Sequence, residues 1–227
     1  VILAVYLANF YSSSDLGEEI LEGTPLQPIK IFVENCLEQT TKEAAILLGE
    51  QGGYIHIPSG LHTINTPIKK TVYWYDNGDL GYPTDEKIIS ELTGYLNDNI
   101  RDCVDAIGRV DGELEIADID TEITLGGYVS VNADIPITLR QGSDRYFISD
   151  FKIEVPIRLK KVLNESRQIA LMLEEEYGGI DLTFMSGLEL ENMIFNYNDR
   201  IRIFTVTDTG SDPNYSIIFA AKLPAVI

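Results

Sequence analysis

Three consecutive runs of residues decide the fold: ELEIADIDTEITL (113–125), YVSVNADIPITLR (128–140) and RYFISDFKIEVPIRL (145–159). Apolar and polar residues alternate in each run, which is the two-residue period of a strand with one buried face. Glycine-containing turns at 126–127 and 141–143 separate the runs. The stretch therefore predicts three strands joined by hairpins, which form an antiparallel meander.

Three amphipathic helices are predicted around this meander, two long ones before it and one after it. In PIKIFVENCLEQTTKEAAILLGEQGG (28–53) and TDEKIISELTGYLNDNIRDCVDAIG (84–108), apolar residues recur every three or four positions. Pro28 suits the first turn of the first helix, and Thr84 suits the N-cap of the second. The third helix is RLKKVLNESRQIALMLEEEYGG (158–179), which ends at two glycines.

Shorter strands are predicted on both sides of these elements. YIHIP (54–58) and the extended segment 61–75 follow the first helix. Four more short strands are expected at 180–184, 192–197, 200–207 and 215–222. Long helices beside runs of adjacent strands, without regular alternation, predict the α+β class with antiparallel sheets. We expect one exported globular domain at 29–227. If this domain is divided, the boundary lies near residue 109, between the helical half and the meander.

The charge balance restricts the function. The 227-residue chain has 17 basic and 36 acidic residues, a net charge of −19, and 44% hydrophobic residues. This hydrophobic content is too high for a disordered tail. Nucleic acids and anionic lipid headgroups are bound by basic surfaces, so we expect no nucleic-acid partner. A strongly acidic surface suits an extracellular protein.

Residues 1–11, VILAVYLANFY, form an apolar segment interrupted only by Asn9. A membrane span needs about 20 such residues, so this segment is too short to span alone. It fits the outer half of a span, the processed stub of a pilin-type leader, or a segment buried in a partner subunit. The alternative is a terminal helix or strand in the chain's own core. We predict an anchor or assembly segment, and favour a helix over a strand added to a neighbour's sheet. Its assembly residues are Val1, Ile2, Leu3, Val5, Tyr6, Leu7, Phe10 and Tyr11.

Residues 12–28, SSSDLGEEILEGTPLQP, are predicted to be a hinge linker. They are rich in Ser, Gly and Pro, and no basic residue precedes Lys30. Because positive residues mark the cytoplasmic flank of a span, this acidic flank indicates the outer side of a membrane. We therefore expect an extracellular or cell-surface location.

The two cysteines, Cys36 and Cys103, lie one in each of the first two predicted helices. Two thiols alone cannot form a structural zinc site. In an exported protein we expect a disulfide that joins the two helices. The alternative is a pair of unpaired thiols in the core.

The sequence carries no catalytic signature. His56 and His62 are the only histidines, and there is neither a His-Glu-x-x-His helix nor a Gly-x-Ser-x-Gly elbow. The glycines at 49–53 follow a helix, whereas phosphate-binding glycines precede one. We therefore predict that the protein is not an enzyme and binds no nucleotide, haem or catalytic metal.

Two acidic groups leave structural Ca²⁺ open as a cofactor, since calcium takes several carboxylate and carbonyl oxygens. They are the set Asp111, Glu113 and Glu115, and the pair Asp208 and Asp212. The favoured interpretation of the first set is a solvated strand face.

Two further groups of residues are candidates for surface contacts. Tyr73, Trp74, Tyr75 and Tyr82 surround an acidic, glycine-rich loop, where they fit stacking on sugars, a subunit contact or packing in the core. Asn164 and Asn214 begin acceptor sequons for N-glycosylation, and Asn214 lies in a predicted turn.

The segment FVENCLEQTTKEAAILLGEQGGYIHIP (32–58) resembles an uncharacterised group of archaeal membrane-anchored surface proteins. These proteins typically open with a hydrophobic leader like that of archaeal type IV pilins. The resemblance implies a second cysteine at the end of a later amphipathic helix, where Cys103 lies. SVNADIPITLR (130–140) and FKIEVPIRLKKVLNESRQIALML (151–173) also look similar to the group. The resemblance covers most of the body, and it implies no catalytic activity.

These observations predict a structural extracellular protein that assembles with copies of itself, through its apolar N-terminus, into a filament or surface layer. The alternative is a monomeric membrane-anchored ectodomain that binds a ligand, a glycan or a partner cell in adhesion. An exported hydrolase is the weakest hypothesis, because the chain has few groups that could converge in a catalytic pocket.

Overall fold

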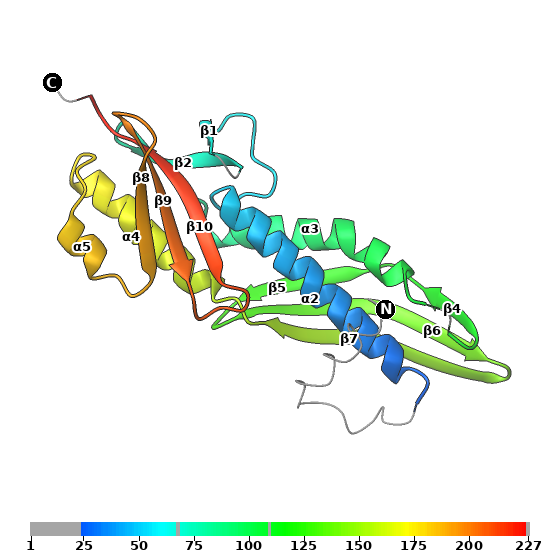
Figure 1. Ribbon diagram of the computed structural model, residues 1–227. Coiled ribbons are helices and arrows are strands. Elements are labelled where there is room, and N and C mark those ends of the chain that lie inside the picture. Colours follow the sequence, from blue (N-terminus) through cyan, green and yellow to red (C-terminus); the bar gives the residue numbers. More distant parts are fainter. Residues whose placement is uncertain (1–23, 67–68, 109, 226–227) are drawn as a thin grey trace, which may run out of the picture.

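The computed structural model describes residues 24–66, 69–108 and 110–225 (Figure 1). Its helices are α2 (Gln27–Glu50), α3 (Asp85–Asp105), α4 (Leu159–Glu175) and α5 (Leu182–Ser186). Its strands are β1 (Thr63–Asn65), β2 (Lys70–Asp76), β3 (Asp79–Leu80), β4 (Glu113–Ile116), β5 (Asp120–Leu125), β6 (Val129–Gln141), β7 (Asp144–Val155), β8 (Glu191–Asn196), β9 (Ile201–Asp208) and β10 (Tyr215–Lys222). The α+β class predicted from the sequence is confirmed. The helix predicted at 1–11 lies outside the described residues.

The first sheet is the predicted meander, with the long strand β6 at its centre. β7 pairs along one side of β6, and β5 pairs along the other side, all antiparallel. β4 extends the β5 side, since it pairs with residues 137–140 of β6 while β5 pairs with residues 129–134. The single strand predicted at 113–125 is therefore two strands. Their junction stays attached to β6, because the Ala117 amide donates to the Pro136 carbonyl (2.9 Å).

The second sheet has the order β1-β2-β10-β9-β8, with β3 paired to β2. β8, β9 and β10 are antiparallel neighbours, as predicted, but β10 runs parallel to β2. One face of this sheet carries a stack of buried aromatic rings. The Phe219 ring lies 4.4 Å from the Trp74 ring and 5.2 Å from the Phe204 ring, centroid to centroid. These contacts fix β2, β9 and β10 against each other.

The helix α2 links the two sheets (Figure 1). It packs against β7 of the first sheet and against β10 of the second. At its C-terminal end, a Cβ on Gly49 would lie 2.2 Å from the carbonyl oxygen of Ser216, so this close approach to β10 requires glycine. α3 packs against α2 and β5, whereas α4 packs against β9, β10 and β2. At the start of α3, the Thr84 hydroxyl accepts from the Lys87 amide (3.3 Å), which confirms the predicted N-cap.

The strand predicted at 54–58 is wrong, because side chains satisfy the backbone of this segment. The amides of Ile55 and His56 donate to Glu91 Oε2 of α3 (2.9 and 2.8 Å). The Gln51 side chain donates to two carbonyls of the segment (3.2 and 2.9 Å). Burial acts to raise the pKa of Glu91, but these amides and a nearby lysine outweigh it, so the pKa is lowered.

The strand predicted at 180–184 is also wrong, because α5 occupies most of this range. Asp181 is its N-cap, and Asp181 Oδ1 accepts from the amides of Thr183 and Phe184 (2.8 and 3.1 Å). An Asp followed by a short apolar run suits a helix start as well as a strand. Residues 27 and 28, the end of the hinge predicted at 12–28, belong to α2, which begins at Gln27.

Candidate functional site

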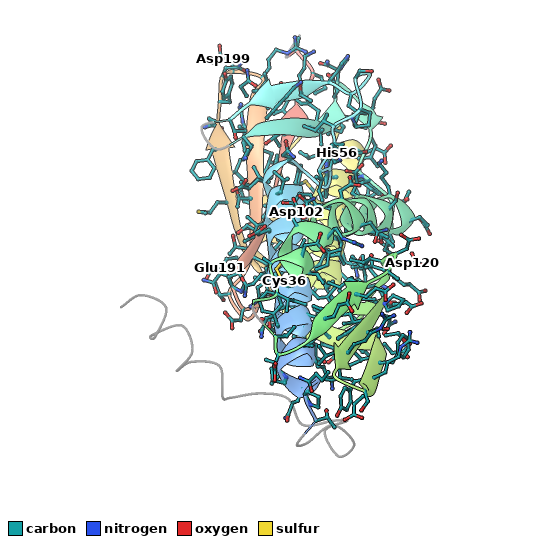
Figure 2. The ribbon with its side chains drawn as sticks, turned by 90° about the vertical axis from the view of Figure 1, so that its right-hand side faces the viewer. Cys36, His56, Asp102, Asp120, Glu191 and Asp199 are labelled. Carbon is teal, nitrogen blue, oxygen red and sulfur yellow. A yellow bond between two sulfur atoms is a disulfide. The ribbon has the colours of Figure 1, made fainter. Side chains whose placement is uncertain are left out.

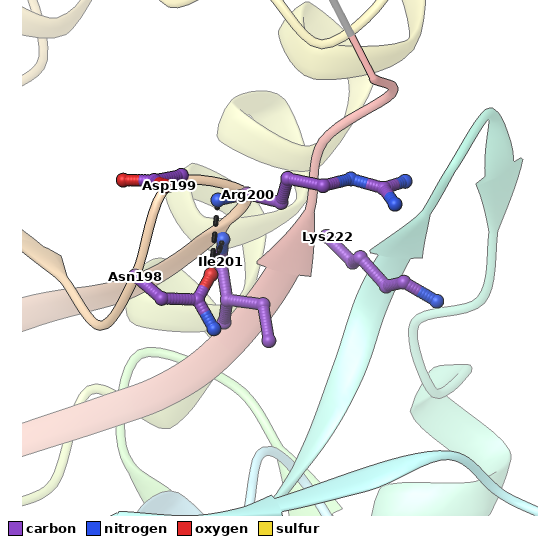
Figure 3. A pocket seen from close by; sticks show the side chains of 5 residues that line it. All are labelled: Asn198, Asp199, Arg200, Ile201 and Lys222. Atoms are coloured by element: carbon purple, nitrogen blue, oxygen red, sulfur yellow. Dashed lines mark hydrogen bonds between the residues drawn. The ribbon is translucent and has the colours of Figure 1, made fainter.

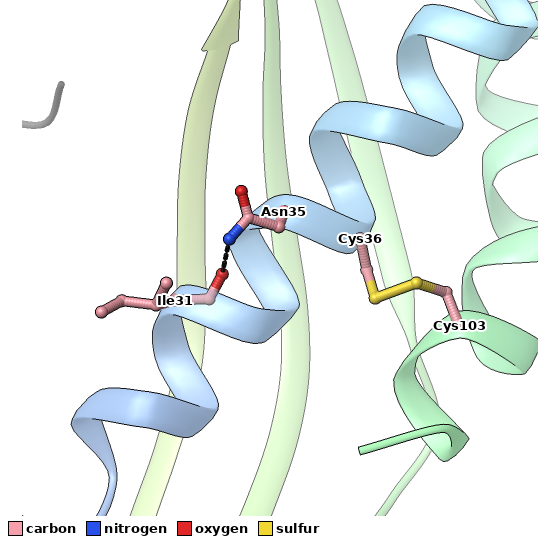
Figure 4. The surroundings of a disulfide bond; sticks show 4 residues. All are labelled: Ile31, Asn35, Cys36 and Cys103. Carbon is pink, nitrogen blue, oxygen red and sulfur yellow. Dashed lines mark hydrogen bonds between the residues drawn. A yellow bond between two sulfur atoms is a disulfide. The ribbon is translucent and has the colours of Figure 1, made fainter. Parts of the chain in front are cut away.

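The two cysteines form a disulfide between α2 and α3 (Figure 4), as the sequence predicts. Cys36 is buried, and Cys103 is half-buried in the last turn of α3. Their Cα atoms lie 5.8 Å apart, and the bond spans 67 residues of sequence. The disulfide joins the helix that links both sheets to the helix that covers β5. The bond uses both thiols of the chain, so neither is free to bind a metal or to act as a nucleophile.

The aromatic cluster is divided between the core and the surface. Trp74 and Tyr75 are fully buried, so the core interpretation is correct for these two residues. Both residues are buried because the Trp74 ring stacks on Phe219 and α4 packs against β2. Trp74 Nε1 donates to the Gly52 carbonyl (2.9 Å), which satisfies its polar atom. Tyr73 and Tyr82 are half-buried, and of these two Tyr73 faces a surface depression.

This depression lies where the ends of β2, β9 and β10 meet. Its lining residues are His62, Thr63, Tyr73, Asp76, Ile201 and Lys222. An adjoining depression shares Ile201 and Lys222 and adds the β8–β9 turn at 198–200 (Figure 3). Asn198 Oδ1 accepts from the amides of Arg200 and Ile201 (2.9 and 2.8 Å), which holds this turn in shape.

Asp76 contacts both a histidine and a lysine in this depression. His62 Nδ1 lies 2.6 Å from Asp76 Oδ2, and Lys222 Nζ lies 3.4 Å from Asp76 Oδ1. Burial acts to raise the pKa of Asp76, but the contacts with His62 and Lys222 outweigh it and lower the pKa. Burial also raises the pKa of Tyr73, helped by the nearby Asp76 and Tyr197. Asp76 is therefore a carboxylate at neutral pH.

This arrangement suits recognition better than catalysis. The His62 side chain is 77% exposed, so bulk water reaches the imidazole and the carboxylate beside it. Catalysis by such a pair would require a reacting group held against it in a water-excluded site. An aromatic ring next to acceptors and donors can instead bind a hydroxyl-rich ligand such as a sugar.

The sequence analysis missed the acidic partners of both histidines. Asp76 reaches His62 because β1 and β2 form a hairpin, and Glu91 Oε2 lies 3.8 Å from His56 Nδ1 across the α3 contact. The separations of 14 and 35 residues match no short metal or catalytic motif. Only the pairing of β1 with β2 could have indicated the first contact.

The calcium candidates are not brought together. The Asp208 carboxylate is buried and accepts from Arg158, from the Ser211 hydroxyl (2.6 Å) and from the Gly210 amide (3.0 Å). Asp212 is exposed and lies in the loop before β10. Within the described ranges, no three His, Cys, Asp or Glu side chains are grouped so that they could hold a metal ion.

The other acidic candidates lie on the outer face of the first sheet. Glu113 and Glu115 point to Arg140 of β6, with closest N–O distances of 3.8 and 3.3 Å. Asp111 is exposed, and its carbonyl accepts from the Gln141 side chain. These contacts match the solvated strand face that the sequence analysis favoured.

The two sequons differ in accessibility. Asn214 is exposed in the loop between β9 and β10. Asn164 is exposed on α4, but Ser166 of the same sequon is fully buried. A glycosylating enzyme must reach both the Asn and the hydroxyl residue, so the loop sequon is the better acceptor of the two.

The predicted assembly segment lies outside the described residues, as does most of the hinge. No helix between residues 24 and 225, in the parts that are described, is long and apolar enough to cross a membrane.

An exposed apolar stripe on β8 was also missed. Met193 and Phe195 of β8 and Tyr197 just after it alternate along the strand, and each is more than half exposed. The alternating pattern predicts a strand at 192–197. It does not show whether other parts of the protein bury the apolar side of that strand.

Comparisons of the chain with protein-family models, with curated proteins and with solved structures found no match.

Proposed function

We propose that this protein is a structural extracellular protein that self-assembles through residues 1–11 into a filament or surface layer. The observation that carries the proposal is a contrast in charge. Residues 1–14 contain no charged side chain, whereas the whole chain has a net charge of −19. Contacts between acidic bodies are repulsive, so the apolar, charge-free segment is the part of the chain best suited to bind other copies.

The described body supports this assignment. Its core is filled by its own helices and sheets, with buried residues from both sheets and from all the long helices. The first turn of α2 lies over β7, at the end of the elongated body away from α4 and α5 (Figure 1). A binding segment attached at one end of an elongated body favours head-to-tail contacts, and such contacts need not close into a ring.

Two further observations agree with an exported structural protein. The disulfide between α2 and α3 is typical of proteins that fold in an oxidising compartment. The resemblance of the body to pilin-like archaeal surface proteins fits an N-terminal assembly segment.

Deletion of residues 1–11 tests the proposal. We expect the full chain to sediment as polymers, and the 12–227 chain to sediment as a folded monomer with the circular dichroism of the full-chain body. Leu7→Asp should also abolish polymers, because it places a charge in the buried segment. Leu7→Ile is the matched control and should polymerise as the unmodified chain does. Polymers that persist in the 12–227 chain would show that another surface drives assembly.

The second candidate function is adhesion by a monomeric ectodomain, and the depression around His62 and Asp76 favours it. Here Asp76→Asn, which keeps the shape but removes the charge, should lower binding of the full chain to a glycan array at least about tenfold, the typical effect of losing a charged hydrogen bond. Asp79→Asn, on the exposed strand β3 outside the lining, is the control. Equal binding by both variants would show that the depression does not bind the glycan.

A further inference from the structure

The strand β8 is an edge strand with an exposed apolar stripe. Among the described residues it pairs with β9 alone, and it runs along the border of the body between Glu191 and Asp199 (Figure 2). Met193, Phe195 and Tyr197 are 52%, 53% and 52% exposed. The opposite side of β8 carries Ile194, which packs against the core. The open side of the strand therefore presents both unpaired backbone groups and an apolar surface.

The stripe continues inward across the sheet. Phe195 pairs with Ile203, Ile203 with Ala220, and Ala220 with Tyr73, so these four residues form one row on one face. Exposure rises along this row toward β8, since Ala220 and Ile203 are buried whereas Phe195 is 53% exposed. Among the described residues, the apolar surface at β8 is thus the open edge of a partly buried face.

After its first residue, Glu191, β8 lacks the charges that usually protect an edge strand. Residues 192–198, NMIFNYN, contain no charged residue and no proline, in a chain with 53 charged residues, 17 basic and 36 acidic. The edge strand β7 shows the usual protection, with Arg145, Asp150, Lys152 and Glu154 along its length. Charged residues on an edge hinder pairing with other strands, so their absence from residues 192–198 leaves this edge open to pairing.

We propose that β8 pairs antiparallel with β8 of a second copy, so that the two second sheets become one continuous sheet. The two-fold axis passes through Phe195, which places Phe195 opposite its own copy and Met193 opposite Tyr197 of the second copy. Both apolar stripes then lie on one face and extend across the axis.

The charge distribution selects a second copy as the occupant. Two acidic bodies repel each other over most of their surfaces, but the seven residues at the centre of this contact carry no charge on either side. Like-charged residues meet only at the two ends, where Glu191 lies opposite Asp199 of the second copy. Both residues are exposed there, so water and salt screen the repulsion.

This contact is separate from the proposed function, because it does not use residues 1–11. A two-fold contact through β8 would join polymers side by side, or join anchored monomers in pairs. Its test therefore has to separate pairing at β8 from polymerisation through the N-terminus.

The test is a disulfide cross-link at the axis in the full chain. The native cysteines are bonded to each other, so Phe195→Cys introduces the sole free thiol. Residues directly opposite in an antiparallel pair have Cα atoms about 4.5–5.5 Å apart, within the range a disulfide spans. We expect Phe195→Cys to form covalent dimers under mild oxidation at least about tenfold faster than Phe147→Cys, the matched control. Phe147 is a 61% exposed phenylalanine on the charge-protected edge β7.

The register gives an independent readout. Met193→Cys should not cross-link with itself, because the two copies of residue 193 are offset by four residues, or about 13 Å. An equal mixture of the Met193→Cys and Tyr197→Cys chains should form mixed dimers. Mixed dimers with little self-linking of either chain would establish the proposed axis.

Three results would overturn the proposal. In the first, Phe195→Cys stays monomeric or links no faster than Phe147→Cys. In the second, Met193→Cys links with itself as fast as in the mixture. In the third, Phe195→Cys links only after residues 1–11 are deleted, which would show that this segment covers β8 in the full chain. Polymers without the Phe195 cross-link would leave the N-terminal function intact. A cross-link in both the full chain and a 12–227 chain that forms no polymers would support β8 pairing alone.

Discussion

Loss of the Cys36–Cys103 bond should lower the free energy of unfolding by about 4 kcal/mol. A bridge that closes a loop of 67 residues restricts the unfolded chain by this amount in the chain-entropy model. Loss of the bond brings no stabilising gain in the folded state, because the bond joins two helices whose packing connects both sheets. We expect the double variant Cys36→Ala/Cys103→Ala to unfold at a urea concentration lower by about 2 M, for a slope of about 2 kcal/mol per molar.

Reducing agent provides the internal control for this prediction. It should destabilise the unmodified chain by a similar amount and should leave the double alanine variant unchanged. A difference of less than about 1 kcal/mol between the oxidised chain and the variant would contradict the structural role of the bond, because removal of a native disulfide typically costs 2–5 kcal/mol.

Arg158→Met should cost about 3 kcal/mol, because it leaves the buried Asp208 carboxylate without its charged partner. Arg158 Nε donates to Asp208 Oδ2 (2.8 Å), and a second guanidinium nitrogen contacts Oδ1. The Arg158 amide also donates to the Ser211 hydroxyl (2.9 Å). These contacts tie the start of α4 to the loop between β9 and β10. The variant keeps the amide bond to Ser211 and loses both side-chain contacts with Asp208.

Lys161→Met is the matched control on the same helix. Lys161 Nζ lies 2.6 Å from Glu189 Oε2, but the glutamate side chain is 76% exposed. Exposed ion pairs contribute about 0–1 kcal/mol, so this variant should unfold at nearly the same urea concentration as the unmodified chain. Equal destabilisation by both methionine variants would show that burial of Asp208 does not determine the energy of its ion pair.

The Asp208 pair also predicts a dependence on pH. Burial acts to raise the pKa of Asp208, but Arg158, Ser211 and the Gly210 amide outweigh it and lower the pKa from 3.8 to about 2. A carboxyl group with a lowered pKa stabilises the fold above its ordinary pKa, and this contribution is lost as the pH falls toward the folded pKa. Between pH 4 and pH 2 the unmodified chain should therefore lose about 2 kcal/mol of stability that Asp208→Asn does not lose. If the free energies of unfolding of the two proteins changed in parallel with pH over this range, the lowered pKa of Asp208 would be contradicted.

The sequence predicts most of the regular structure because burial on one face imposes a period. Alternation along β6 and the helical stripe around Cys36 each determined an element and its inward side. The errors lie where a specific polar side chain competes with the pattern. Glu91 binds the backbone of residues 55–56 and prevents a strand, and Asp181 caps a helix where a strand was expected.

Contacts between distant segments could not be predicted from local pattern. The parallel pairing of β10 with β2 joins residues about 150 positions apart, and it places Lys222 beside Asp76 and His62. The exposed stripe on β8 could not be predicted for the same reason. Only the strand order shows that β9 lies between β10 and β8, and that β8 is the last strand of this sheet among the described residues. The disulfide was predictable without that information, because the chain has two cysteines and each lies on the apolar stripe of a predicted helix.

Sedimentation velocity of the unmodified full chain, with its disulfide intact, tests the central proposal most directly. The chain has a mass of 25.4 kDa, and a polymer sediments far faster than a monomer of this size. Self-assembly through residues 1–11 predicts a broad distribution of fast-sedimenting polymers at micromolar protein concentration in physiological salt. A single species at the monomer mass, unchanged as the protein concentration is raised, would contradict it.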